Sequence, residues 1–188
     1  MVEPTYFLAC PIFEDNGFHG KLRGVPESSE GIDIDFLRRE FDQAETSAVQ
    51  SARSQGIPDI PQLKTGPNYP NKIYKYVVYC VPTFSNPSGK TFSLENRRAL
   101  VKLAREYDAL VISDDVYDFL SWPADQRAAI DAVAPPQPRL VDIDRELPGF
   151  SHWGNTMSNG SFSKVIGPGV RVGWAEASPA FIQNLGEV

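Results

Sequence analysis

Four short segments of the sequence carry side chains that could do chemistry together. They are Asn-Pro-Ser-Gly at residues 86–89, Asp-Asp-Val-Tyr at 114–117, Ser-Phe-Ser-Lys at 161–164 and Gly-Pro-Gly-Val-Arg-Val-Gly-Trp at 167–174. A lysine amine can attack a carbonyl group and hold it covalently, and an arginine guanidinium binds phosphate through paired hydrogen bonds. Read singly, each segment has an ordinary alternative: a turn, a capping carboxylate, a solubilising lysine, or an arginine that enters a strand.

The elements around these segments predict an α/β fold with a mostly parallel sheet flanked by helices. Apolar runs predict four strands, at residues 76–81, 109–113, 159–163 and 170–175. An amphipathic stretch at 93–107 predicts a helix between the first two strands, with Ser93 as its N-cap. Strand, helix and strand in this order indicate a right-handed parallel crossover. The polar segments then fall at strand ends, where open parallel sheets bind their ligands.

The rest of the chain adds one long helix and two irregular connections. The helix is expected to open at Asp33 or Asp35 and to continue to about residue 54. Residues 56–71 and 135–138 are rich in proline, which is typical of surface loops. No internal repeat is present, and the loops read as insertions in one sheet, so residues 1–188 are expected to form a single structural unit.

Together and in this order, the four segments resemble the class I/II aminotransferases, which are pyridoxal-phosphate (PLP) enzymes of fold type I. The resemblance extends from Pro-Thr-Tyr at 4–6 to Val-Gly-Trp at 172–174. The Ser-Phe-Ser-Lys and Pro-Gly-x-Arg-x-Gly-Trp patterns are most similar to those of aminoadipate and aromatic-amino-acid aminotransferases. The resemblance implies PLP as cofactor and transfer of the amino group of an L-amino acid to a 2-oxo acid, in amino acid metabolism.

The resemblance also implies a role for each polar residue around the cofactor ring. Lys164 holds the cofactor covalently and later moves the proton of the substrate carbon. Asp114 stabilises the protonated pyridine nitrogen, while Tyr117 and Asn86 donate to the phenolate oxygen of the ring. Asp115 competes with Asp114 for the nitrogen. Because neighbours at a strand end point to opposite faces, only one of the two can reach it, and the spacing to Tyr117 favours Asp114.

The cofactor phosphate is a dianion and needs fixed donors. The resemblance gives this role to Arg171 and to the hydroxyl of Ser161, with Ser163 as an additional donor. Tyr6 occupies the place at which the family stacks an aromatic ring on the face of the cofactor.

Composition argues against several other classes of function. The 18 basic and 24 acidic residues give a formal charge of −6, which disfavours nucleic acid or an anionic membrane as partner. Cys10 and Cys80 are expected to be reduced thiols in a cytoplasmic protein, and His19 and His152 lack metal-ligand spacing, so no metal is predicted. A Rossmann nucleotide-binding domain is disfavoured, because the sequence contains no Gly-x-Gly-x-x-Gly after its first strand and no Gly-Lys-Ser/Thr loop.

The resemblance further predicts that residues 1–188 are a partial PLP-binding large domain. Family members carry a phosphate-binding glycine loop before the position of Met1. After the position of Val188 they carry a small domain that grips the substrate carboxylate, and they form homodimers. We therefore expect the chain alone to be impaired in transamination. Two alternatives stay open: a PLP-dependent lyase or decarboxylase of the same fold, and a catalytically inert fragment.

Overall fold

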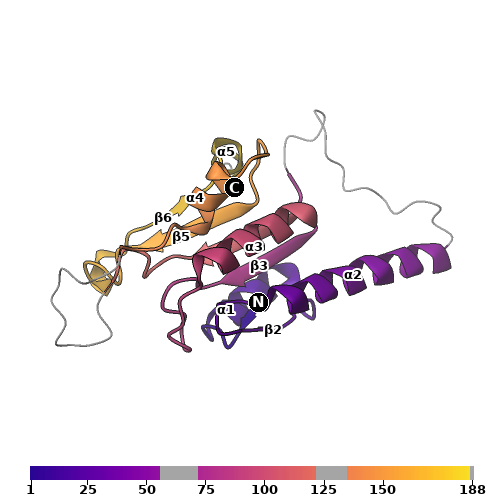
Figure 1. The fold of residues 1–188 in the computed structure, drawn as a ribbon, viewed down its shortest axis with the longest axis horizontal. Helices are drawn as coiled ribbons and strands as arrows, with labels where there is room; N and C mark the ends of the chain where they lie inside the picture. Colours follow the sequence, from indigo (N-terminus) through magenta and orange to yellow (C-terminus); the bar gives the residue numbers. More distant parts are fainter. Residues whose placement is uncertain (56–71, 122–134, 187–188) are drawn as a thin grey trace.

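The computed structural model describes residues 1–55, 72–121 and 135–186, and its centre is a four-stranded sheet with helices packed against it (Figure 1). The strands follow the order β3-β4-β5-β6. Their bounds are β3 (Tyr76–Cys80), β4 (Ala109–Asp114), β5 (Thr156–Ser161) and β6 (Gly173–Glu176). A separate parallel pair is formed by β1 (Val2–Glu3) and β2 (Val25–Pro26).

Five α-helices accompany the strands in the described part of the chain: α1 (Ala9–Phe13), α2 (Ile34–Ser54), α3 (Leu94–Glu106), α4 (Leu140–Glu146) and α5 (Pro179–Leu185). Side-chain caps set where the longer ones begin. Asp33 accepts from the backbone N–H of Phe36 at 2.8 Å, and Ser93 accepts from that of Asn96 at 3.2 Å. The expected caps of α2 and α3 are therefore confirmed, with Asp33 rather than Asp35 opening α2.

The predicted α/β architecture with a mostly parallel sheet is confirmed. β3, β4 and β5 are mutually parallel, as expected for strands joined by crossovers. β6 instead pairs with β5 in the antiparallel sense. The connection from β5 to β6 is a short loop that includes the single-turn 3₁₀ helix η3 (Pro168–Val170). A loop this short returns the chain along the neighbouring strand rather than across the sheet.

Two strand boundaries also differ from the prediction. The strand expected at 159–163 is β5, which begins and ends earlier in the chain, at Thr156–Ser161. The strand expected at 170–175 starts only at Gly173, because Pro168 opens a helical turn in front of it. The proline-rich residues 135–138 have no regular structure, as predicted. The other predicted loop, 56–71, lies outside the described residues.

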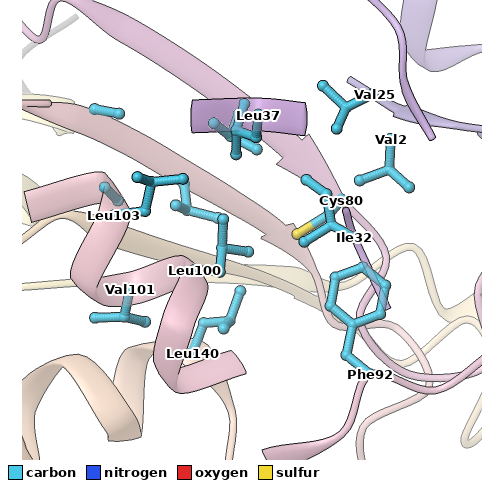
Figure 2. Close-up of a cluster of buried hydrophobic side chains, with 14 of the residues drawn as sticks. Val2, Val25, Ile32, Leu37, Cys80, Phe92, Leu100, Val101, Leu103 and Leu140 are labelled. Atoms are coloured by element: carbon cyan, nitrogen blue, oxygen red, sulfur yellow. The ribbon is translucent and has the colours of Figure 1, made fainter. Parts of the chain in front are cut away.

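The hydrophobic core lies between the sheet, α2, α3 and α4 (Figure 2). From the sheet it takes Val78, Cys80 and Val111, and from α3 it takes Leu100, which is fully buried. Side chains of successive strand residues point to opposite faces of a sheet, so these alternating positions define the covered face. Packing on this covered face holds the strands together, and the opposite face of the sheet can carry polar groups.

The opposite face carries a smaller cluster, formed by Ala9 of α1 with Tyr79 and Val81, against which Ile112 and Tyr117 pack. This face holds the functional side chains described below. Both Cys10 and Cys80 are free thiols, as predicted. Among the described residues, no helix combines the length and the apolar character that a membrane span requires.

Candidate active site

The polar segments identified in the sequence gather at one edge of the main sheet. β3, β4 and β5 run in the same direction, so their carboxyl ends lie at this edge. β6 runs the opposite way, and its first residue, Gly173, pairs with Ser161, the last residue of β5. The start of β6 therefore meets the same edge. The antiparallel direction of β6 thus leaves all four polar segments at the carboxyl edge, where parallel sheets bind ligands.

Asp114 is the last residue of β4, and each of its carboxylate oxygens accepts a hydrogen bond. The hydroxyl of Tyr79 on β3 donates to Oδ2 at 2.8 Å, and the side-chain amide of Asn159 on β5 donates to Oδ1 at 3.0 Å. Burial raises the pKa of Tyr79, and the carboxylate of Asp114 raises it further, so the hydroxyl keeps its proton and remains a donor. The carboxylate itself is half-buried and reaches the open side of the sheet.

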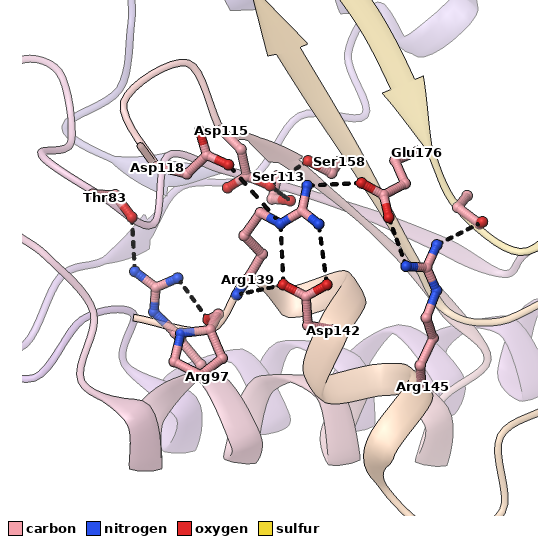
Figure 3. A network of polar contacts seen from close by, with 12 residues as sticks. Thr83, Arg97, Ser113, Asp115, Asp118, Arg139, Asp142, Arg145, Ser158 and Glu176 are labelled. Atoms are coloured by element: carbon pink, nitrogen blue, oxygen red, sulfur yellow. Dashed lines mark hydrogen bonds and ion pairs between the residues drawn. The ribbon is translucent and has the colours of Figure 1, made fainter. Parts of the chain in front are cut away.

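Asp115 points to the opposite face, as the sequence predicted for neighbours at a strand end. It is 1% exposed, and its Oδ2 accepts from the hydroxyl of Ser113 at 2.7 Å and from that of Ser158 at 2.6 Å (Figure 3). Burial raises the pKa of this carboxyl. Asp115 therefore ties β4 to β5 from beneath, while Asp114 faces the cluster of α1.

Two arginines on the same side as Asp115 anchor the loops that lead to the site (Figure 3). Arg97 of α3 is fully buried and donates to the carbonyl of Pro82 at 2.9 Å and to the hydroxyl of Thr83 at 2.8 Å. Arg139 pairs with Asp142 and with Glu176 of β6. Charge-assisted hydrogen bonds of this kind are stronger than neutral ones. They fix the loop after β3 to α3 and the start of α4 to β6.

Lys164 and Tyr117 lie side by side. The ammonium of Lys164 is 5.9 Å from the centre of the Tyr117 ring, which is within cation–π range. Lys164 is exposed, whereas Tyr117 is half-buried against the cluster that contains Tyr79. Tyr6 lies in the segment before α1, and its ring meets that of Phe7 edge-on, with ring centres 5.3 Å apart. Asp114, Tyr117 and Lys164 are thus connected through the cluster that contains Tyr79.

The residues expected to bind phosphate form a second group, in the connection from β5 to β6. The hydroxyls of Ser161 and Ser163 are 2.9 Å apart, and the backbone N–H of Phe162 donates to the carbonyl of Val172 at 3.1 Å. Arg171 adjoins Val172 and is exposed. It lies before β6 rather than inside the expected strand, in a left-handed conformation with φ of 52° that non-glycine residues rarely adopt. Its guanidinium donates to the carbonyl of Pro168 at 3.4 Å.

Asn86 is exposed in the turn after β3. The turn is closed by backbone hydrogen bonds from Ser85 to Lys90 and from Gly89 to Ser85. Its base is held by Arg97, so the amide of Asn86 sits on an anchored loop at the same edge as Asp114. The structure shows no direct contact between Asn86 and the other expected site residues among those it describes.

The sequence analysis missed Tyr79 and Asn159, the two partners of Asp114. Each lies on a different strand, and both contacts depend on the register that brings Asn159 beside Asp114 and Tyr79 beside Ile112. The alternation of Tyr79 and Val81 on one face was readable, but the register between strands was not. His19 and His152 remain without a role, and the described residues contain no group of acidic, histidine or cysteine side chains that could hold a metal.

Comparison with known proteins gives the same family over nearly the whole chain. The family described as aminotransferase class I and II matches residues 6–188. An uncharacterised protein of Saccharomyces cerevisiae, YER152C, is 42% identical over 94% of this chain and 38% of its own length. The aromatic-amino-acid aminotransferase 1 of Thermococcus litoralis is 26% identical over 97% of this chain and 33% of its own length.

A solved structure agrees in fold. LysN, the α-aminoadipate aminotransferase of Thermus thermophilus, superimposes with a TM-score of 0.66 and 26% identity, over 99% of this chain and 36% of LysN. The chain therefore spans 33% to 38% of the length of these relatives. The match of the family over residues 6–188, the shared fold and the site at the carboxyl edge of the sheet lead to one conclusion: the chain belongs to the class I and II aminotransferase family.

Proposed function

We propose that the protein is a PLP-dependent aminotransferase, which transfers the amino group of an L-amino acid to a 2-oxo acid. The observation that carries this proposal is the pairing of Lys164 with Tyr117 at the edge where Asp114 ends β4, in a member of the aminotransferase family. LysN, which shares the fold, was solved with an N-(5'-phosphopyridoxyl)-L-leucine adduct.

The donor set at the edge of the sheet fits PLP in its chemistry. An exposed amine at Lys164 can reach an aldehyde from solvent, and the half-buried carboxylate of Asp114 suits a protonated ring nitrogen. The paired hydroxyls of Ser161 and Ser163, with the exposed guanidinium of Arg171 in the same loop, suit a phosphate dianion. The aldehyde, the ring nitrogen and the phosphate of PLP would thus each have a side chain of suitable chemistry at this edge of the sheet.

The residues divide the work of transamination. When bound, PLP supplies an electron sink that makes the substrate α-carbon acidic. Lys164 Nζ would hold the cofactor covalently, and the amine released when the substrate amino group takes its place would accept the proton of that carbon. Asp114 holds the proton on the ring nitrogen, and the side chains of Tyr117 and Asn86 donate to the phenolate oxygen. Ser161, Ser163 and Arg171 bind the phosphate, and Tyr6 covers one face of the ring.

The similarity to relatives suggests the remaining properties. We propose an aromatic amino acid or 2-aminoadipate as amino donor, since such enzymes are among the relatives. We further propose that residues 1–188 are part of a PLP-binding large domain, that the whole protein is a cytoplasmic homodimer, and that it serves amino acid metabolism.

The test is covalent trapping of the cofactor. The purified protein is mixed with PLP and reduced with borohydride, and the modified peptide is identified by mass spectrometry. We expect the adduct on Lys164 and its loss in Lys164→Ala, while the matched variant Lys102→Ala, at an exposed lysine of α3, keeps it. An adduct spread over several surface lysines, or one that persists in Lys164→Ala, would contradict the proposal.

A further inference from the structure

We infer that Tyr79 is a positioning residue for Asp114, and that its hydroxyl fixes the carboxylate which meets the ring nitrogen of the cofactor. The inference rests on the proposed function and extends it to a residue outside the family motifs. Tyr79 Oη lies 2.8 Å from Asp114 Oδ2, and the two side chains come from adjacent parallel strands.

The strand register explains how the two side chains meet. Tyr79 pairs with Ile112, so Tyr79, Ile112 and Asp114 all point to the same face of the sheet. Tyr79 is level with Ile112, two residues further from the edge than Asp114, and its long side chain extends toward the edge to reach the carboxylate. The hydroxyl thus approaches Asp114 from within the sheet, and the open edge remains available for a ligand.

The ring of Tyr79 is held in place by its surroundings, which distinguishes it from the other donor. Tyr79 is 7% exposed and packs with Ala9 and Val81, and the ring of Phe13 meets it edge-on at 5.7 Å. Asn159 is exposed, so water can replace its hydrogen bond to Asp114. Tyr79 is therefore the donor that sets the orientation of the carboxylate.

The arrangement leaves Asp114 able to bind a third partner. An ionised carboxylate offers about four acceptor sites on its two oxygens, and Tyr79 and Asn159 use one on each oxygen. A protonated ring nitrogen can take one of the remaining sites without breaking either bond. A carboxylate that is already oriented loses less side-chain entropy when the cofactor binds.

A double-mutant cycle tests whether Tyr79 acts through Asp114. Tyr79→Phe keeps the packed ring and removes the hydroxyl. We expect it to weaken PLP binding about tenfold, the equivalent of one hydrogen bond to a charged group. In an Asp114→Asn background the same change should have less than about a twofold effect, because the carboxylate it positions is gone. Tyr76→Phe on the same strand, whose hydroxyl bonds Glu45 at 3.3 Å, is the matched control and should stay within about twofold of the wild type.

Two further readouts separate positioning from a general loss of structure. The pH at which the absorption of the bound cofactor changes should shift by about one unit in Tyr79→Phe and stay constant in Tyr76→Phe. In the cofactor-free protein, Tyr79→Phe should lower the urea midpoint of unfolding more when Asp114 is present than when it has been replaced in the Asp114→Asn background. This last measurement reports the hydrogen bond even if PLP does not bind.

The outcomes distinguish the two proposals. Equal tenfold losses in both backgrounds, or an unchanged pH profile, overturn the role of Tyr79 and leave the aminotransferase proposal standing. Absence of the Lys164 adduct in the wild type overturns the proposed function and removes this inference with it. If the effects of Tyr79→Phe and Asp114→Asn on the urea midpoint simply add, the two side chains do not interact. That result overturns the inference whether or not the cofactor binds.

Discussion

Three carboxylates within five residues have unlike surroundings, and this decides what each can do. Asp114 faces the open side of the sheet with a donor on each oxygen. Asp115 is buried beneath it and bonds two serines. Asp118 is 6% exposed, and its Oδ1 has no hydrogen-bond partner in the described structure. Only Asp114 combines an oriented carboxylate with access from solvent. The other two acids belong to the support of the loop.

The contribution of Asp118 to the free energy of unfolding depends on pH. Burial, and then the charge of Asp115, raise the pKa of Asp118 from 3.8 to about 6, against the opposing attraction of Arg139, whose Nε lies 3.9 Å from Asp118 Oδ2. Between these two values the folded protein binds more protons at this site than the unfolded chain does. The free energy of unfolding contributed by Asp118 is therefore highest in acid and falls as the pH rises through this window.

Asp118→Asn should remove that dependence. We expect the variant to gain about 1–2 kcal/mol of stability relative to the wild type between about pH 4 and about pH 7, because asparagine cannot acquire the charge. Urea unfolding of both proteins at several pH values measures the difference. Asp15→Asn, at an exposed residue, isolates the effect of burial. A constant difference between wild type and Asp118→Asn across this range would contradict the raised pKa.

At the scale of elements, the close approach of β5 and β6 depends on Gly160. Gly160 pairs with Trp174 across the two strands, and a Cβ atom at this glycine would overlap the indole of Trp174. The indole also packs on Phe162, with ring centres 4.9 Å apart. The glycine therefore lets the indole of Trp174 lie directly against β5, immediately before the residues expected to bind the cofactor.

Gly160→Ala should displace Trp174 and loosen this pair of strands. We expect a loss of about 1–3 kcal/mol in the free energy of unfolding, as for other overpacked sites, and a change in tryptophan fluorescence. Gly169→Ala is a matched control in the adjacent loop, because its Cβ would meet open space. Equal stability and equal fluorescence in both variants would show that Trp174 does not depend on the glycine.

The same elements show what the sequence could predict. β3, β4, α3 and the cap of α2 followed from hydrophobic runs and capping residues, which act locally. The start of β6 did not, because Val170 and Val172 continue the hydrophobic pattern while Pro168 starts a turn before them. The hydrogen bond from Tyr79 to Asp114 depends on register between strands, which tertiary packing decides. The sequence thus predicted the strands at whose ends the polar residues lie, and the structure added the two partners of Asp114.

At the scale of the whole molecule, the candidate site joins parts of the chain that are distant in sequence. The turn with Asn86, the end of β4 with Asp114 and the loop with Lys164 lie at one edge because β3, β4 and β5 run side by side in parallel. Asp115, Arg97 and Arg139 lock this edge from the covered face. A ligand that contacts all of these loops at once binds the folded protein and not the unfolded chain, so it stabilises the whole fold.

PLP should therefore raise the melting temperature, and its phosphate should carry part of the effect. At a concentration of about a hundredfold over Kd the gain is about 2.7 kcal/mol, or about 5–10 °C for a chain of this size. Pyridoxal, which lacks the phosphate, should give a smaller shift at equal concentration. Arg171→Gln combined with Ser161→Ala should abolish the advantage of PLP over pyridoxal, because both donors lie in the loop from β5 to β6.

Thermal unfolding of the wild type and the double variant with each ligand makes the comparison. Arg98→Gln, at an exposed arginine of α3, removes the same charge outside the loop between β5 and β6 and should leave the advantage of PLP intact. If Arg98→Gln reduces the PLP-induced rise in melting temperature as much as the double variant does, the phosphate responds only to the net charge of the protein. In that case the loop between β5 and β6 is not its binding site, and Arg171 and Ser161 lose their proposed role.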